Sequence, residues 1–366
     1  MLSAEPAGGA SSSAAQTSVS SEHSVRSTQH SLLGHEWAVA ALIRALAAGR
    51  ATHAYLITGP AQVGKFTTAL AMAQVLLCEK GTGCRECRNC RLQERRAHPD
   101  LRILERPAER KTIPIKDVHE FTQGIALRPL EASRRVLIID GADQLSVDGS
   151  DALLKNLEEP PPAVTFLLTA PDLAAVLPTI ASRCQRVALH RVPQRAIEDY
   201  LIEQRGIPLE QAAIIAQAAA GCPGWAISAS REPELLERRR RWAADLLHLL
   251  SVGSLDRIRY ADNLADRWSR DSAAVRAPLE EWLRVWQDAA YAQLEVPRTR
   301  SLLASEEGPR VAQGLGAREV AAMLRATIDT LDALEANANP RLALETLVLR
   351  LPTIPAERPA EPAVAR

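Results

Sequence analysis

The sequence of 366 residues has few aromatic side chains and no excess of charge of either sign. Phe, Trp and Tyr make up 4% of the chain, and 44 Lys and Arg residues balance 44 Asp and Glu residues. Proteins that bind nucleic acid by themselves usually stack bases on aromatic rings and carry a basic surface. The composition therefore argues against a chain whose main function is to bind nucleic acid alone.

Long hydrophobic runs are also missing. The most apolar stretch, residues 38–48, is interrupted by Arg44 and is shorter than the roughly 20 residues that cross a bilayer. The first residues have neither the basic start nor the apolar middle of a secretion signal. We therefore expect neither a membrane span nor a secretion signal, and the clustered cysteines described below favour the cytoplasm.

Composition divides the chain into five segments. Residues 1–28 and 352–366 are poor in large apolar side chains, and both are predicted to be disordered. Residues 29–190 alternate apolar strands with helices, which indicates an α/β domain with a parallel sheet. Residues 191–231 predict a small domain of short helices, and residues 232–351 predict an all-helical domain.

Several elements are expected with definite bounds. Buried strands are predicted at 54–59, 135–143 and 165–170, and helices at 67–77, 151–159 and 278–294. Pro278 is expected at the first position of its helix, where a missing N–H has no cost. The last of these helices places Leu279, Trp282, Leu283 and Trp286 on one face.

The sequence GPAQVGKF lies between an expected strand and an expected helix. Gly59, Gly64 and Lys65 fit the phosphate-binding pattern G-x-x-x-x-G-K-[ST]. The last position, where a hydroxyl would bind Mg²⁺, is Phe66, and a phenyl ring does not ligate a cation that requires oxygen. The hydroxyl of Thr67 is displaced by about 100° around the helix. The pattern therefore predicts a nucleotide-binding loop that lacks one metal ligand.

A second apolar strand carries Asp140, the expected position of another Mg²⁺ ligand. In P-loop proteins that hydrolyse ATP, the next residue is usually a Glu that polarises the attacking water, but here it is Gly141. Two independent losses, at Phe66 and Gly141, predict negligible ATP hydrolysis, because the loss of one charged catalytic group already costs several kcal/mol. Nucleotide binding stays open, because Lys65 and the glycines are present.

Four of the six cysteines lie within thirteen residues, at Cys78, Cys84, Cys87 and Cys90. Four thiolates with this spacing can enclose one tetrahedral Zn²⁺, and such a closed site is structural. Cys78 also fits a buried thiol at the end of an apolar helix. Clustered thiols beside a nucleotide loop favour a metal and a reducing compartment over disulfides.

Together, these segments resemble the clamp-loader branch of the AAA+ family, and within it the delta-prime subunits of bacterial DNA polymerase III. The resemblance extends from about Leu32 to Leu351. It rests on the segments HAYLITGP, the four-cysteine insert, HPDLRIL, RRVLIIDGAD, ALLKNLEEPP, LPTIASRCQR and NANPRLALETLVLRL, in this order. It implies a AAA+ P-loop domain with a zinc knuckle at residues 78–90, a helical lid domain and a helical collar domain that holds a ring together.

The resemblance also implies a function. The chain would be a non-hydrolysing subunit in a hetero-pentameric ring with motor subunits and a delta subunit, and this ring places the sliding clamp on primed DNA. Arg183, in the sequence Ser-Arg-Cys, would act as an arginine finger on the ATP of an adjacent motor subunit. From the residues alone, a solvated surface Arg is the better prediction. The polar sensor expected near Thr169 is ambiguous, and the sequence Gly-Trp-Ala has no Arg where motor relatives sense the γ-phosphate.

Two other interpretations stay open. One is an ATP-hydrolysing motor subunit of the gamma/tau type in the same loader, against which Phe66 and Gly141 argue. The other is a zinc-dependent nucleic-acid-binding module, against which the balanced charge and the scarce aromatics argue.

Overall fold

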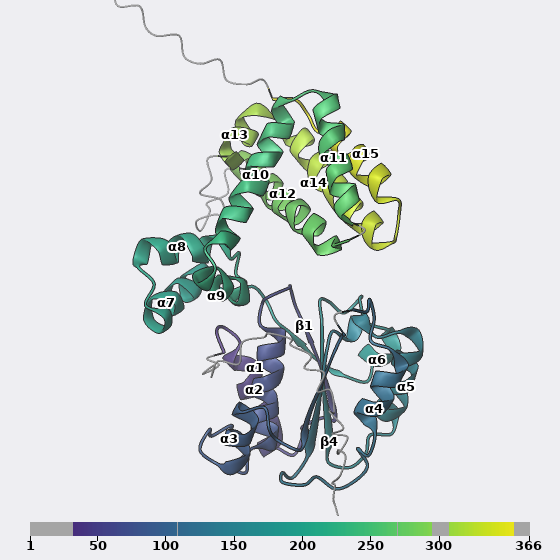
Figure 1. Cartoon of the computed structure of the whole chain (residues 1–366). Coiled ribbons are helices and arrows are strands. Elements are labelled where there is room, and N and C mark those ends of the chain that lie inside the picture. The colour runs from purple at the N-terminus through teal and green to yellow at the C-terminus, as the bar shows by residue number, and fades with distance from the viewer. Residues whose placement is uncertain (1–31, 108, 269, 295–306, 355–366) are drawn as a thin grey trace, which may run out of the picture.

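The computed structural model describes residues 32–107, 109–268, 270–294 and 307–354. These residues form an α/β domain, a small group of three helices and a helical bundle (Figure 1). The predicted disordered segment 1–28 lies outside the described residues, and so do residues 355–366 of the second one. Within the described ranges, no helix has the length and apolar content that a membrane crossing needs.

A five-stranded sheet in the order β2-β3-β4-β1-β5 forms the centre of the α/β domain, and all neighbouring strands are parallel. The strands are β1 (Ala54–Thr58), β2 (Leu101–Glu105), β3 (Arg135–Asp140), β4 (Val164–Ala170) and β5 (Gln185–Ala188). The apolar runs predicted the three inner strands β1, β3 and β4. They did not predict β2 and β5, because both are edge strands with partly exposed side chains.

Helices cover both faces of this sheet (Figure 1). One face carries α1 (Glu36–Ala47), α2 (Lys65–Leu77) and α3 (Arg88–Glu94), and the other carries α4 (Ile115–Thr122), α5 (Val147–Glu158) and α6 (Pro178–Ala181). A short 3-10 helix, η1 (Ala142–Gln144), follows β3. Alternate strand residues point to opposite faces, so Ile57 and Ile138 pack on the α2 side while Leu56 and Ile139 pack on the α5 side.

Three short helices follow the sheet domain. They are α7 (Gln194–Arg205), α8 (Leu209–Ala218) and α9 (Pro223–Arg231). Ile197, Leu201 and Trp225 are buried in their common core. Arg239, on the next helix, joins this group to the bundle: its guanidinium lies 3.6 Å from the centre of the Trp225 ring and 3.5 Å from the carboxylate of Glu281.

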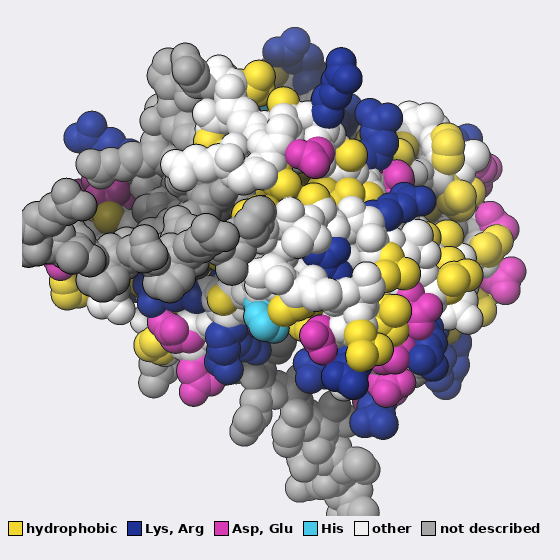
Figure 2. Space-filling model, turned by 90° about the horizontal axis from the view of Figure 1, so that it is seen from above, with side chains coloured by type: hydrophobic (Ala, Val, Ile, Leu, Met, Phe, Trp, Pro, Cys, Tyr) yellow, Lys and Arg dark blue, Asp and Glu magenta, His cyan; other side chains and the backbone are white. Residues whose placement is uncertain are grey.

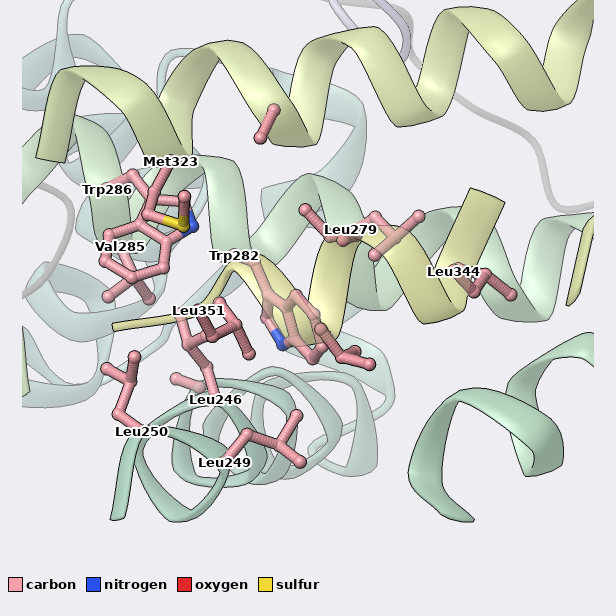
Figure 3. Packing of buried hydrophobic residues seen from close by; sticks show 14 of the residues in the cluster. Leu246, Leu249, Leu250, Leu279, Trp282, Val285, Trp286, Met323, Leu344 and Leu351 are labelled. Carbon is pink, nitrogen blue, oxygen red and sulfur yellow. The ribbon is translucent and has the colours of Figure 1, made fainter. Parts of the chain in front are cut away.

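The helical bundle consists of α10 (Glu234–Ser251), α11 (Ser254–Trp268), α12 (Ser272–Gln293), α13 (Glu307–Gly314), α14 (Ala317–Glu335) and α15 (Pro340–Arg350). Figure 3 shows Trp282 and Trp286 of α12 among aliphatic side chains of the surrounding helices. Both indoles are fully buried, so the predicted apolar face of α12 forms the centre of the bundle core. On the face seen from above, Lys and Arg are interspersed with Asp, Glu and hydrophobic side chains (Figure 2).

The prediction for Pro278 is wrong, because this residue lies inside α12 and not at its start. The helix begins at Ser272, where the side chain of Asp271 accepts a hydrogen bond from the Ala274 N–H (3.1 Å). This cap satisfies a free N–H of the first turn. The cap therefore sets the start of the helix upstream of Pro278.

Residues 352–354, which we assigned to the C-terminal tail, are held against the bundle. The buried guanidinium of Arg257 donates hydrogen bonds to the carbonyls of Leu249 (2.8 Å), Leu351 and Pro352 (3.0 Å). The N–H of Ile354 donates to the Leu250 carbonyl (2.9 Å). The tail therefore begins further along the chain than its composition suggests.

We expect Arg257→Met to lower the free energy of unfolding of the bundle by about 3 kcal/mol, because it leaves buried carbonyls without a donor. Arg259→Met is the control, since Arg259 is exposed and pairs only with exposed Asp256. Thermal unfolding followed by circular dichroism measures both. Equal midpoints for the two variants would show that Arg257 does not anchor the C-terminal segment.

Candidate functional site

The loop from Gly59 to Gly64 lies at the carboxyl end of β1 and leads into α2. A Cβ on Gly59 would lie 2.7 Å from the carbonyl oxygen of Leu189, so only glycine fits there. Gly64 caps α2 with φ of +109°, a conformation that favours glycine. The two glycines therefore have the backbone roles that a phosphate-binding loop requires.

Lys65 reaches back into this loop. Its ammonium donates hydrogen bonds to the carbonyls of Gly59 (2.8 Å) and Pro60 (2.9 Å). Burial lowers the pKa of Lys65, while the carboxylates of Asp140 and Asp143 act in the opposite direction. A bound phosphate would compete with the two loop carbonyls for this ammonium.

Asp140 ends β3, and Thr169 lies next to it on β4. The Thr169 hydroxyl donates to the Asp140 carboxylate (2.5 Å) and accepts a hydrogen bond from the N–H of Gly141 (2.9 Å). Thr169, whose role was ambiguous in the sequence, therefore contacts the acidic residue directly. Gly141 has φ of +88°, where a glutamate side chain would be strained. The backbone after Asp140 is thus suited to glycine and not to the missing acid.

Phe66 packs against the core between the sheet and α1 and α2. The guanidinium carbon of Arg96, just after α3, lies 5.8 Å from the centre of its ring. Thr67 is half-buried, and Thr68 uses its hydroxyl to donate to the Gly64 carbonyl (2.9 Å). Position 66 is therefore a packing position that connects α2 to the segment after α3.

The three-helix group contacts the loop through Gly224, a residue that no sequence pattern indicated. The N–H of Gly224, in the first turn of α9, donates to the carbonyl of Gln62 (2.9 Å). A Cβ on Gly224 would lie 2.8 Å from that oxygen. The only signal in the sequence is a glycine directly after Pro223, and it does not reveal this partner.

The structure brings the four predicted cysteines together. The sulfur atoms of Cys78, Cys84, Cys87 and Cys90 all lie within 4.8 Å of one another, and those of Cys78 and Cys84 are 3.6 Å apart. A tetrahedral zinc with Zn–S bonds of about 2.3 Å needs sulfurs about 3.8 Å apart. The four residues therefore fit a zinc ion, which would be closed to substrates.

Backbone N–H groups surround this cluster. Burial alone would raise the pKa of Cys78, but N–H donors from Cys84, Thr82 and Lys80 outweigh burial and lower this pKa to about 6. The N–H of Cys87 donates to the sulfur of Cys84 (3.4 Å), and the N–H of Cys90 donates to that of Cys87 (3.4 Å). Such donors stabilise thiolates. They also lower the pKa of Cys87, whereas burial raises the pKa of Cys90.

The cysteine segment is anchored on α2. The amide of Asn89 donates to the Leu77 carbonyl (3.0 Å), and the amide of Gln93 donates to the Leu70 carbonyl (3.0 Å). Cys78 itself is the C-cap of α2. A metal bound by the cysteines would therefore fix the helix that starts at the phosphate loop.

Arg183 lies after α6, away from the loop. Its guanidinium forms an ion pair with Glu158, the last residue of α5 (2.7 Å), and donates to the Thr179 carbonyl (2.8 Å). Two residues later β5 begins at Gln185, which pairs with Tyr55. Tyr55 precedes Gly59 by four residues, or about 13 Å of strand. Arg183 is thus at the amino ends of the strands, and the loop is at their carboxyl ends.

The sheet domain is similar in sequence to known proteins. Residues 34–193 match the family described as "DNA polymerase III, delta subunit". These residues are therefore similar to the DNA polymerase III delta-subunit family. The match covers the sheet domain with its cysteine segment and ends where the three-helix group begins.

Curated relatives of this family come from several bacteria. The chain is 32% identical over 194 residues to "DNA polymerase III subunit delta'" of Bacillus subtilis (52% of this chain, 58% of the relative). It is 33% identical over 188 residues to that of Pseudomonas aeruginosa (50% and 57%). It is also 34% identical over 198 residues to "DNA polymerase III subunit tau/gamma" of Haemophilus influenzae (52% and 28%).

The match thus spans little more than half of the delta-prime relatives and less of the tau/gamma relative. Identity alone does not separate the two subunit types, because both match equally well. The residues that bear on the choice between the delta-prime and tau/gamma types are Phe66 and Gly141.

We expect the purified protein to contain about one zinc per chain, because four thiolates complete a tetrahedral site. Cys87→Ser should lower the zinc content strongly, whereas Cys184→Ser, outside the cluster, should leave it unchanged. Metal analysis after gel filtration measures both. Zinc-free wild-type protein, or equal zinc content in both variants, would contradict the site.

Proposed function

We propose that this chain is a non-hydrolysing, delta-prime-type subunit of the bacterial DNA polymerase III clamp loader, and that Arg183 acts in the ATP site of a neighbouring motor subunit. The observation that supports this most strongly is the position of Arg183. It lies at the amino ends of the parallel strands, opposite the chain's own phosphate loop. An arginine there is suited to contact the nucleotide of another subunit, where it would stabilise charge on the transferring phosphoryl group.

The chain's own loop would serve as a structural joint. Nucleotide binding there would use Gly59, Gly64, Lys65, Thr67 and Asp140. Hydrolysis would not follow, because position 66 has a phenyl ring that packs against the core and offers no oxygen to Mg²⁺. In addition, Gly141 adopts a conformation that a glutamate does not readily take. The loop also contacts the lid through Gly224 and Gln62, so it would transmit the position of the sheet domain to the lid.

The proposed partners are the motor and delta subunits of a hetero-pentameric ring, the sliding clamp, and primer-template DNA within the assembled complex. The bundle from α10 to α15 would form the collar, and the four cysteines would hold a structural zinc. The similarity to tau/gamma subunits supports a motor subunit as the alternative. Phe66 and the backbone of Gly141 favour the non-hydrolysing assignment.

We expect Arg183→Ala to leave assembly of the loader intact and to slow hydrolysis at the adjoining site by about 10³-fold, as loss of an arginine finger does elsewhere. The DNA-dependent ATPase rate of the whole ring should fall by the fraction that the adjoining site contributes to it. Arg186→Ala, which removes an exposed arginine of β5, is the control. An unchanged ATPase in rings that contain the Arg183 variant would refute the finger.

Phe66→Thr alone should not produce ATP turnover by the isolated chain. The substitution restores a hydroxyl that can bind Mg²⁺, but Gly141, directly after Asp140, has no carboxylate to polarise water. A phosphate-release assay with the variant, and with Phe66→Thr combined with Lys65→Ala, tests this. Turnover that depends on Lys65 would show that the chain is a motor subunit with one altered residue.

A further inference from the structure

The arginine at the centre of the proposed function is not free in this structure. One terminal nitrogen of Arg183 lies 2.7 Å from a carboxylate oxygen of Glu158. The other donates to the Thr179 carbonyl (2.8 Å) and to the Ser182 hydroxyl (3.3 Å). Thr179 and Ser182 are close neighbours in the chain, so Glu158 is the partner that comes from a separate element.

Glu158 projects from a well-fixed position. It is the last residue of α5, and Pro160 to Pro162 follow it and prevent the helix from continuing. The preceding side chain, Leu157, is buried in the core that α5 forms with the sheet, and Cys184 packs against the same core. The core therefore fixes the backbone on both sides of the ion pair.

The ion pair between Arg183 and Glu158 is too exposed to contribute much to the stability of the fold. The Arg183 side chain is 35% exposed and that of Glu158 is 52% exposed, and ion pairs with such exposure contribute little to folding. Geometry gives a better reason. A guanidinium carries five N–H donors in a rigid plane, and the three contacts above leave two donors for phosphate oxygens.

We propose that Glu158 is the positioning residue of Arg183: it fixes the plane of the guanidinium so that its remaining donors are oriented before the neighbouring ATP arrives. This inference rests on the proposed arginine finger. A finger that is already oriented loses less side-chain entropy when it binds the transferring phosphoryl group. Glu158 would therefore act on the rate of the chemical step and not on ATP affinity.

An inhibitory role for Glu158 predicts the opposite effect on the rate of hydrolysis. If Glu158 held Arg183 away from the neighbouring site, its removal would free the finger and speed up hydrolysis. The chain offers a matched control in Glu159, an adjacent and exposed glutamate with the same charge. The comparison of the two positions separates orientation of Arg183 from a general change in surface charge.

The test uses the assembled loader with primed DNA and the clamp, and it compares Glu158→Ala, Glu158→Gln and Glu159→Ala. Single-turnover hydrolysis at saturating ATP should be about 10-fold slower with Glu158→Ala, with an unchanged KM for ATP and an unchanged thermal midpoint. Glu158→Gln keeps an oxygen that accepts the hydrogen bond, so its rate should stay within about 3-fold of wild type. Glu159→Ala should match wild type.

Arg183→Ala, alone and combined with Glu158→Ala, tests the arginine finger separately from its positioning by Glu158. If Glu158 acts through Arg183, the double variant should be no slower than Arg183→Ala alone. No effect of Arg183→Ala would overturn the finger itself. A slow Arg183→Ala together with a Glu158→Ala that is as fast as wild type, or faster, would overturn the positioning role and leave the finger intact.

Discussion

The parallel register of the sheet is the constraint on which the rest of the account depends. All five strands run the same way, so the phosphate loop, Asp140 and Thr169 lie together at the carboxyl ends. The segment that carries Arg183 enters β5 from the amino end and pairs with Glu158 at the end of α5. One chain therefore has the loop from Gly59 to Gly64 at one end of the strands and Arg183 at the other. In the proposed ring, these two ends of neighbouring subunits would face each other.

Within the loop, the departures from an ATPase are part of the fold and not isolated losses. Phe66 packs against the core, and its ring faces the guanidinium of Arg96, which follows the cysteine segment. Gly141 adopts a left-handed conformation beside the Asp140–Thr169 hydrogen bond. The cysteine segment is in turn anchored on α2, the helix that begins at Lys65. The loop thus contacts the sheet, the helix that carries the cysteine segment, and the three-helix group α7–α9.

Sequence patterns within short segments predicted the inner strands and the cysteine cluster. The apolar runs located β1, β3 and β4, and the cysteine spacing identified four sulfurs that converge in space. The edge strands β2 and β5 were missed, because exposed edges lack the apolar signal of buried strands. The contact of Gly224 with Gln62 and the pairing of Glu158 with Arg183 join distant segments, and a single sequence does not reveal such pairs. Pro278 shows the reverse case, where a sound local rule was overridden by the cap at Asp271.

The central claim is that the chemistry of this chain takes place in a neighbour's site. A structure of the assembled loader with a non-hydrolysable ATP analogue, determined by electron cryomicroscopy, tests this most directly. The account predicts that the Arg183 guanidinium lies within about 3 Å of a γ-phosphate oxygen bound to the adjacent motor subunit, which is hydrogen-bond distance. An Arg183 that faces solvent or the chain's own core in that complex, with another residue on the γ-phosphate, would contradict it.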